Sequence, residues 1–284
     1  MIDNRNLIVV KCGTGGVSHE AVADDIAALR RAQRSVVLVH GGADDIDELA
    51  SRLGVEQRRM VAPDGVSSRY TDDATLDVMV LALAGRAKPR FVTALAARGV
   101  AAVGLTGLDA GLLAATRKRA HRAVVDGRTV IVRDDHSGRI TRVNASLLHM
   151  LLAAGLVPVI SPPAVAEDHR PVNVDADRVA AAIATALGAA HLVMLTASPG
   201  VLEDVEDEST RMARLTLGAE AEPASDGAPR VSGGMGLKLV AARAALLGEV
   251  PEVTIADGRV ATPVLKALTG EGTRVFLSRS EEVA

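Results

Sequence analysis

The sequence predicts an α/β fold, a three-layer αβα sandwich with a mainly parallel open sheet, and three observations support this prediction. Runs rich in Val, Leu and Ile recur along the chain at 7–12, 35–40, 156–161 and 191–196, as expected for strands buried on both faces. Helical sequence separates these runs, which favours βα units. Two of the runs end in a polar residue followed by glycines, a pattern typical of the ligand-binding edge of such a sheet.

The length and composition are those of a globular protein that forms one large α/β domain or two lobes sharing a sheet. The 284 residues are 48% hydrophobic and 24% charged, enough to bury a sizeable core. The aromatic residues are Tyr70, Phe91 and Phe276, too few for the stacking surface of a single-strand nucleic-acid binder. The net charge of −3 gives no general attraction to nucleic acid or to membranes.

The cysteine count and the hydropathy favour the cytoplasm. Cys12 is the single cysteine, which excludes an internal disulfide and a multi-cysteine zinc site. The sequence shows no signal peptide and no uninterrupted apolar span of the roughly 20 residues that a membrane helix needs. We therefore expect a cytoplasmic protein with neither a nucleic-acid nor a membrane partner.

The stretch Leu7–Gly16, LIVVKCGTGG, is the first candidate for a ligand site. Its apolar run ends in Lys11, and the glycines that follow let the backbone approach a ligand with N–H groups facing outward. A helix beginning near Ser18 would place this turn at a helix N-terminus, where anions bind. Taken alone, the stretch favours a plain strand-to-helix turn with a solvent-exposed lysine, because short glycine motifs are weak signals.

The stretch SVVLVHGGAD at 35–44 repeats this arrangement. His40 takes the place of Lys11, and Gly41-Gly42 forms the glycine pair. The two units put two glycine turns at the same edge of a parallel sheet, where ligands bind in open α/β folds. His40 fits either a hydrogen-bonded strand-end histidine, the commoner role, or a phosphate contact.

The elements of the first half follow in order. Ser18 predicts the cap of a helix over 19–31, and a further helix is predicted to start near 71–73 and to be followed by a second helical run to Arg98. A strand is expected within 100–110.

Residues 116–142 differ in character, being basic and alternating. Asp126-Gly127 and Ser137-Gly138 are hairpin-type turn signals. We therefore expect one antiparallel hairpin that projects from the main sheet.

The second half repeats the βα pattern. Asn144 and Asp175 are candidate N-caps, and Gly188 is expected to end a buried helix. Residues 203–233 predict a polar flap with little regular structure. After the flap, SGGMGLKLVAARAALLG resumes a helix, and a strand, a short helix and a last strand complete the chain.

Three charged residues fall where this topology predicts the sheet edge. Lys11 ends a strand, Asp177 lies in the first turn of a buried helix, and Lys238 begins a helix after a glycine pair. Two lysines, glycine N–H groups and one carboxylate suit phosphoryl transfer, which needs positioning and charge neutralisation more than a covalent nucleophile. The sequence contains no Walker-type loop and no HRD or DFG motif. Asp177 alone would be taken for a helix-dipole partner.

Together these stretches resemble the amino acid kinase family, and within it the N-acetylglutamate kinase branch. The resemblance covers nearly the whole chain and rests on VVKCG, VVLVHGGAD, SSRYTDDATLDV, AVGLTGLDA, GLVPVISPP, VNVDADRVAAAIATALGA, GGMGLKLVAA and GEGTRVFL in this order. The SRYTD segment and the basic segment are most similar to kinases that act on 2-aminoadipate or glutamate attached to a small acidic amino-group carrier protein.

The resemblance implies ATP-dependent phosphorylation of the side-chain carboxylate of a carrier-bound acidic amino acid, giving an acyl phosphate for lysine, arginine or related biosynthesis. Mg²⁺ would be carried by the nucleotide. Two alternatives stay open: an N-acetyl-L-glutamate kinase of arginine biosynthesis, and a non-catalytic regulatory homologue that binds nucleotide.

The resemblance also implies roles for residues around the transferred phosphoryl group. Lys11 and Lys238 would stabilise that group from opposite sides, and Asp177 would hold both lysines by charge-assisted hydrogen bonds. The remaining phosphate contacts would be the backbone N–H groups of Gly13, Gly41 and Gly42.

Further roles concern the two substrates. Arg69 would pair with the carboxylate of the amino-acid substrate, and Asn173 would position its amide region. The residues implied for ATP are Thr196, Gly200, Gly234 and Met235. Residues 1–174 would form the substrate and dimerisation lobe and residues 175–284 the ATP lobe of a homodimer.

The chain departs from the family pattern at the turns. Gly13 is followed by Thr14 where the family has two adjacent glycines, so the register of this loop stays open. HGGA replaces HGGG, TASPG replaces the usual start of the nucleotide turn, and Asp175 stands where the branch has asparagine. None of these departures removes a charged catalytic group.

The basic segment admits two interpretations. Its cations could dock the acidic carrier protein beside the active site by electrostatic steering, or they could form an ordinary solvated surface. The candidate docking residues are Arg117, Lys118, Arg119 and Arg122.

Overall fold

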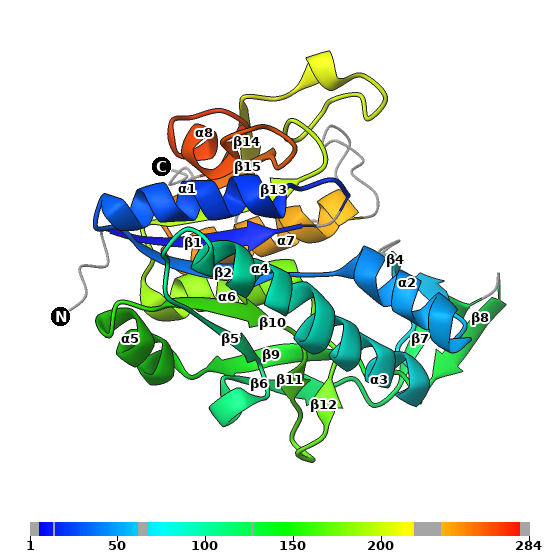
Figure 1. The fold of residues 1–284 in the computed structure, drawn as a ribbon. Coiled ribbons are helices and arrows are strands. Elements are labelled where there is room, and N and C mark those ends of the chain that lie inside the picture. Colours follow the sequence, from blue (N-terminus) through cyan, green and yellow to red (C-terminus); the bar gives the residue numbers. More distant parts are fainter. Residues whose placement is uncertain (1–5, 14, 62–66, 126–127, 219–233, 279–284) are drawn as a thin grey trace, which may run out of the picture.

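In the part of the chain that the structure describes, a central sheet of eight strands organises the molecule (Figure 1). The computed structural model describes residues 6–13, 15–61, 67–125, 128–218 and 234–278. All neighbouring strands run parallel except β15 and β16, so the predicted open, mainly parallel α/β sheet is confirmed. The order across the sheet is β14 (Arg214–Leu217), β16 (Thr273–Leu277), β15 (Glu252–Asp257), β13 (His191–Thr196), β1 (Leu7–Cys12), β2 (Ser35–His40), β10 (Val157–Ser161) and β5 (Ala102–Thr106).

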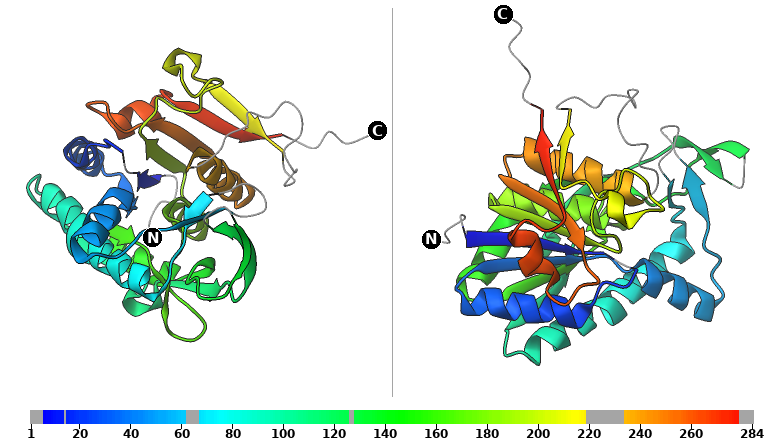
Figure 2. Two further views of the ribbon diagram at one scale, coloured as in Figure 1. Left: turned by 90° about the vertical axis from the view of Figure 1, so that its right-hand side faces the viewer. Right: turned by 90° about the horizontal axis from the view of Figure 1, so that it is seen from above.

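Helices cover both faces of this sheet (Figures 1 and 2). One face packs against α1 (His19–Arg31), α4 (Lys88–Ala96) and α8 (Pro263–Leu268). The other face packs against α5 (Ala145–Ala153), α6 (Ala176–Leu187) and α7 (Gly234–Leu247). None of the helices in the described part of the chain is both long and apolar enough to cross a bilayer.

A third group of helices extends beyond the sheet. It consists of α2 (Ala43–Leu53), α3 (Asp73–Ala82) and a π-helical turn at Leu83–Ala87 that continues into α4. The small apolar cluster that these helices share lies next to the second glycine turn, because α2 begins directly after Gly42.

Strand alternation decides which face each side chain of β1 reaches. Leu7 and Val9 belong to the core on the α6 and α7 side, whereas Ile8, Val10 and Cys12 belong to the core on the α1 and α4 side. Successive side chains of a strand point to opposite faces. Lys11 therefore faces α6 and α7.

The predicted helix caps are present. Ser18 Oγ accepts a hydrogen bond from the Ala21 N–H at 3.1 Å, and Asn144 Oδ1 accepts one from Leu147 at 3.3 Å. Asp175 Oδ1 accepts the N–H of Arg178 at 3.0 Å at the start of α6. At its other end α6 stops at Gly188, whose φ of 58° is the left-handed conformation that glycine adopts most readily.

The basic segment 116–142 contains the predicted antiparallel hairpin, at 121–132, but the segment as a whole contributes to two small sheets. β7 (His121–Val125) and β8 (Arg128–Val132) pair in a sheet with β3 (Arg59–Val61) and β4 (Ser67–Arg69), which extends away beyond α2 (Figure 1). Their connecting turn at Asp126-Gly127 lies outside the described residues.

The second predicted turn of this segment, at Ser137-Gly138, is wrong. Gly138 begins β9 (Gly138–Val143), which pairs with β6 (Leu113–Arg117) in a sheet with β11 (Ala164–Val165) and β12 (Pro171–Val172). Glycine is needed for close approach rather than for a turn, because a Cβ there would lie 2.9 Å from the Thr116 carbonyl oxygen.

The expected polar flap is also partly wrong. A 3₁₀ turn at Glu208–Thr210 is followed by β14, an edge strand of the central sheet that pairs in parallel with β16. Arg214 and Thr216 are exposed and Leu215 is buried. A strand with so few buried residues has the polar composition of a loop, and the sequence therefore did not indicate it. Residues 219–233 of the flap lie outside the described residues.

Candidate active site

Three charged side chains from different elements meet at the carboxyl edge of the central sheet. Lys11 comes from the end of β1, Asp177 from the first turn of α6 and Lys238 from the first half of α7. The Lys11 Nζ lies 2.9 Å from Asp177 Oδ1, and the Lys238 Nζ lies 3.0 Å from Asp177 Oδ2. One carboxylate thus bridges two ammonium groups.

All three groups are buried, with residue exposures of 5% for Lys11, 5% for Asp177 and 8% for Lys238. Burial lowers the pKa of Lys11, but the charge and hydrogen bond of Asp177 outweigh it and leave that pKa above the ordinary lysine value. Burial and the neighbouring charge of Lys11 lower the pKa of Lys238. Burial alone would raise the pKa of Asp177, yet the two ammonium groups hold it below its usual range.

This charge balance favours an anionic ligand. Two buried ammonium groups share one carboxylate, and removing charges from water is costly unless each is well paired. Asp175 adds little compensation, because burial and the charge of Asp177 raise its pKa and its carboxylate caps α6. A phosphate placed between Lys11 and Lys238 would supply the missing negative charge.

The two glycine turns lie beside this cluster. They line a cavity of about 180 Å³ together with residues of α1, α2 and α4. Gly13 has no room for a side chain, because a Cβ there would lie 2.7 Å from the Leu195 carbonyl oxygen; a Cβ on Gly42 would lie 2.7 Å from Leu83 Cδ2 and would have to displace that side chain. The backbone itself therefore forms this wall of the site.

The N–H groups of the glycines are not equivalent. Gly13 donates its N–H to the Leu195 carbonyl at 3.2 Å, and Gly41 donates to Cys12 at 3.3 Å. A phosphate contact to either would require exchanging these bonds, so their role as phosphate donors stays a prediction. None of the described residues accepts the N–H of Gly42, which stands at the start of α2.

Among the described residues, the predicted amino-acid contacts are bonded to side chains outside the lysine–aspartate cluster. Arg69, at the end of β4, donates to Asp47 Oδ1 at 2.6 Å and to the side-chain oxygen of Gln57. Asn173 donates its amide N–H to Thr71 Oγ1 at 2.9 Å. Both side chains are already held in place by neighbours, and their contact with substrate stays a prediction.

The predicted nucleotide residues lie at two places along the same sheet edge. Thr196 ends β13, and its carbonyl accepts the N–H of Gly258 at 2.8 Å. Gly200 has a φ of 152°, and a Cβ there would lie 2.5 Å from Thr273 Oγ1. Gly234 begins α7, while Met235 is partly buried against the core.

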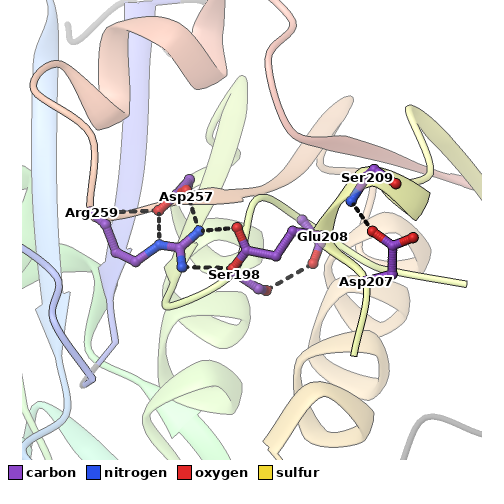
Figure 3. Close-up of polar contacts among 7 residues, drawn as sticks. Ser198, Asp207, Glu208, Ser209, Asp257 and Arg259 are labelled. Carbon is purple, nitrogen blue, oxygen red and sulfur yellow. Dashed lines mark hydrogen bonds and ion pairs between the residues drawn. The ribbon is translucent and has the colours of Figure 1, made fainter. Parts of the chain in front are cut away.

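An ion-pair cluster beside the turn after Thr196 escaped the sequence analysis (Figure 3). The Arg259 guanidinium pairs with both carboxylate oxygens of Glu208, at 2.7 and 3.0 Å, and its Nε donates to Asp257 Oδ1 at 2.8 Å. In the adjoining turn, Ser198 Oγ donates to the Gly200 carbonyl at 2.9 Å. Arg259 thereby ties the 3₁₀ turn at 208–210 to the end of β15.

The candidate docking residues do not form one surface. Arg117 is turned inward, where its Nε donates to the Asp135 carbonyl at 3.3 Å beside His136. Lys118 and Arg119 are exposed, and the Arg119 guanidinium lies 3.9 Å from Glu167. The side chain of Arg122 lies outside the described residues.

Two further findings concern a second cavity and the residues that could bind a metal ion. A cavity of about 500 Å³ lies away from the lysine–aspartate cluster, lined by Tyr70, Arg128, Asp134 and neighbouring residues of β8. Within the described ranges, no three or more His, Cys, Asp or Glu side chains are grouped so as to hold a metal ion. That magnesium is carried by the nucleotide stays a prediction.

Comparisons with known proteins indicate one family for this chain. A family model described as the amino acid kinase family matches residues 6–257. A LysW-aminoadipate kinase of Thermus thermophilus is 37% identical over 270 residues, which cover 95% of this chain and 100% of that protein. An acetylglutamate kinase of Symbiobacterium thermophilum is 38% identical over 270 residues, which cover 93% of this chain and 89% of that protein.

A solved structure supports the same fold. The N-acetylglutamate synthase of Neisseria gonorrhoeae, in complex with coenzyme A and N-acetyl-glutamate, superposes with a TM-score of 0.72 at 26% identity. The match covers 97% of this chain and 60% of the synthase chain.

Proposed function

Because the chain belongs to the amino acid kinase family, we propose that it uses ATP to phosphorylate the side-chain carboxylate of an acidic amino acid, 2-aminoadipate or glutamate, held on a small carrier protein. The observation that carries this proposal is the bridging of Lys11 and Lys238 by Asp177 at the sheet edge. This arrangement provides two fixed cations that share one carboxylate, and a transferred phosphoryl group would take up the remaining positive charge.

The reaction requires little covalent chemistry from the protein. A carboxylate oxygen of the substrate forms a bond to the γ-phosphorus while the bond from that phosphorus to the β–γ bridging oxygen breaks, giving an acyl phosphate and ADP. The attacking carboxylate is ionised at pH 7, so no general base is needed. Magnesium on the nucleotide would neutralise phosphate charge.

Lys11 and Lys238 would act on the charge that spreads over the phosphoryl oxygens as the bond to ADP breaks. Fixed cations in a water-poor site stabilise such charge without reorganising during the reaction. Asp177 keeps both ammonium groups in place, since the Nζ atoms of Lys11 and Lys238 both hydrogen-bond to its carboxylate. Arg69 would exchange its contact with Asp47 for the carboxylate of the amino-acid substrate.

The named relatives support two possible acceptors for this chain. Similarity to the LysW-aminoadipate kinases supports an amino acid bound to a carrier protein, and similarity to the acetylglutamate kinases supports free N-acetyl-L-glutamate. We take the carrier-bound acceptor as the main proposal because aminoadipate-type relatives of Thermus and Deinococcus match over 95% of this chain.

The proposed function is tested by trapping the acyl phosphate with hydroxylamine. Purified enzyme with ATP and Mg²⁺ is expected to form hydroxamate with carrier-bound aminoadipate or glutamate at a kcat/KM at least about tenfold above that for N-acetyl-L-glutamate, since one decade corresponds to about 1.4 kcal/mol of differential transition-state binding. The same acceptors without ATP serve as the control. Equal or faster turnover of N-acetyl-L-glutamate would favour the alternative, and nucleotide binding without turnover of any acceptor would indicate a regulatory homologue.

The carrier would dock through the exposed end of the basic segment. Lys118 and Arg119 follow β6 at the surface, and the Arg119 side chain is 87% exposed. Exposed cations of this kind accelerate encounter with an acidic partner in a salt-dependent way. Arg117 is assigned a different part, because its guanidinium holds the loop that carries Asp135 and His136.

Charge reversal separates docking from chemistry. Arg119→Glu is expected to lower kcat/KM for the carrier-bound acceptor about tenfold at low salt and less at high salt, because rim charges act mainly on association. Arg31→Glu, which reverses an exposed arginine at the end of α1, is the matched control and is expected to change kcat/KM less than about twofold. Equal effects of the two reversals would contradict docking at Arg119.

The remaining features of the proposal concern organisation. Residues 1–174 would bind the amino acid and residues 175–284 the nucleotide, with the continuous pairing of β1 and β13 joining the two parts. A homodimer would form through the first part, where α3 exposes 57% of Leu81. The biosynthetic reaction would take place in the cytoplasm.

A further inference from the structure

His40 occupies a position that the proposed chemistry does not explain. It ends β2, where it pairs in register with Cys12, and only 1% of its surface is exposed. Because Val36 and Leu38 belong to the α1 and α4 core, the His40 side chain lies on that face too, with its ring 5.2 Å from Phe91. The imidazole is therefore on the face opposite to Lys11, Asp177 and Lys238.

Among the described residues, the ring makes one hydrogen bond, and that bond is to the glycine turn. His40 Nδ1 lies 2.8 Å from the carbonyl oxygen of Gly41. A carbonyl oxygen only accepts, so Nδ1 carries the hydrogen and Nε2 of the neutral ring is bare. Nε2 is buried without a partner among the described residues. Burial lowers the pKa of His40 to about 4, which keeps the ring neutral at pH 7.

The hydrogen bond fixes the orientation of one peptide unit. The Gly41 carbonyl and the Gly42 N–H belong to the same planar trans peptide, so they point in opposite directions. With the carbonyl held toward His40 on one face, the Gly42 N–H is directed toward the other face. That face carries the Lys11–Asp177–Lys238 cluster, and a Cβ on Gly41 would lie 3.8 Å from Ala176, the neighbour of Asp177.

A glycine pair would not keep this orientation unaided. Glycine adopts both signs of φ with little cost, so a Gly-Gly peptide can rotate by about half a turn. The rotated peptide would present the Gly41 carbonyl oxygen, instead of an N–H, to the phosphoryl group. A side chain at Gly42, which could restrict this rotation, would have to displace Leu83, whose Cδ2 would lie 2.7 Å from the added Cβ.

We propose that His40 is a positioning residue that holds the Gly41–Gly42 peptide so that the Gly42 N–H faces the transferred phosphoryl group. The inference rests on the proposed function and deepens it, since it names the residue that orients a backbone donor of the same site. His40 acts from behind the turn and touches no reacting atom.

Three substitutions test this assignment with hydrogen bonding and packing separated. His40→Asn places its amide nitrogen the same number of bonds from Cβ as Nδ1, so it can still donate to the Gly41 carbonyl. His40→Leu fills the apolar surroundings near Phe91 but cannot donate. His40→Gln carries its amide one bond further out and is expected to fall between the two.

His40→Asn is expected to have the higher kcat of the two main variants, whereas His40→Leu is expected to have the higher Tm. Loss of one oxyanion-type donor costs about 10²–10³ in rate, and misorientation costs less, so His40→Leu is expected to lower kcat about 10- to 100-fold. Its KM for ATP is expected to stay within about threefold of the wild type, since uniform binding is retained. His40→Asn is expected to keep kcat within about fivefold while having the lower Tm, because a buried amide packs poorly beside Phe91.

A purely structural histidine would give the reverse result, with kcat following Tm and leucine tolerated better than asparagine. That outcome would overturn the inference. These measurements use whichever acceptor the wild-type enzyme phosphorylates.

Failure of the proposed function is distinguished by a binding experiment. If the wild type phosphorylates no acceptor, MgADP with aluminium fluoride, a planar mimic of the transferred phosphoryl group, serves as the probe in calorimetry. His40→Leu is then expected to weaken binding of this pair about tenfold relative to MgADP alone, a loss of about 1.4 kcal/mol, and His40→Asn is expected to retain it. An equal affinity of the wild type, His40→Leu and His40→Asn for the mimic would overturn the inference independently of turnover.

Discussion

Asp177→Asn is expected to lower kcat by on the order of 100-fold or more and to destabilise the fold by about 3–5 kcal/mol. Asp177 is the carboxylate that both Lys11 and Lys238 contact, at 2.9 and 3.0 Å. An amide in its place leaves two buried ammonium groups without an anion and unable to hold their positions. Steady-state kinetics and urea unfolding measure the two effects.

Asp175→Asn is the matched control for this variant. It removes the same charge two residues away, but asparagine also caps helices well, so the hydrogen bond to the Arg178 N–H is retained. We expect kcat within about fivefold of the wild type and a change in unfolding free energy below about 1 kcal/mol. If Asp175→Asn were as damaging as Asp177→Asn, general charge rather than the bridging geometry would be responsible.

Lys11→Met is expected to abolish turnover, with a loss of about 10³-fold or more in kcat, while the fold stays intact. The ammonium group that would face the transferring phosphoryl is removed, and cations in this role contribute about 10³–10⁵ in related reactions. Asp177 keeps its contact with Lys238, and replacing a buried ion by an apolar side chain of similar length is often neutral for stability. Unfolding free energy is therefore expected to change by less than about 1 kcal/mol.

The control for this variant is Lys88→Met. Lys88 is a half-buried lysine of α4 that packs over Gly104 on the other face of the sheet, without contact to Asp177. It is expected to retain kcat within about threefold. Substantial residual turnover in Lys11→Met at a normal Tm would contradict the role proposed for Lys11.

The central sheet could be predicted well from the sequence because its strands are short apolar runs bounded by caps and glycines. The runs at 35–40 and 191–196 match β2 and β13. Such strands are buried on both faces, so their composition is one-sided and easy to recognise. The site edge followed from the same logic, since the carboxyl ends of parallel strands lie at one edge.

The errors occurred where structure depends on partners distant in sequence. Residues 116–142 alternate like a hairpin, yet β6 and β9 pair in one sheet while β7 joins β3 in another. Alternation reports a half-buried strand but does not identify its neighbour. β14 was missed because an edge strand with exposed Arg214 and Thr216 has the composition of a loop.

The same reason explains which parts of the site could not be predicted. The contact of Arg69 with Asp47 could not be predicted because it depends on the rotation of α2 about its axis. The pairing of Arg259 with Glu208 joins residues that are brought together by the edge of the sheet. The orientation of the Gly41–Gly42 peptide depends on a single hydrogen bond that leaves no trace in the composition.

The position of β1 in the middle of the sheet has a consequence for synthesis on the ribosome. Its first neighbour, β2, follows within a few dozen residues, but its second neighbour is β13, which pairs from Ile8 with His191 to Cys12 with Leu195. At translation rates of about 5–20 residues per second, the second partner emerges roughly ten to forty seconds after the strand itself. During that interval one edge of an apolar strand has no partner in its own sheet, the condition under which nascent chains aggregate or engage chaperones. The strand that carries Lys11 is made first and waits longest for its second neighbour.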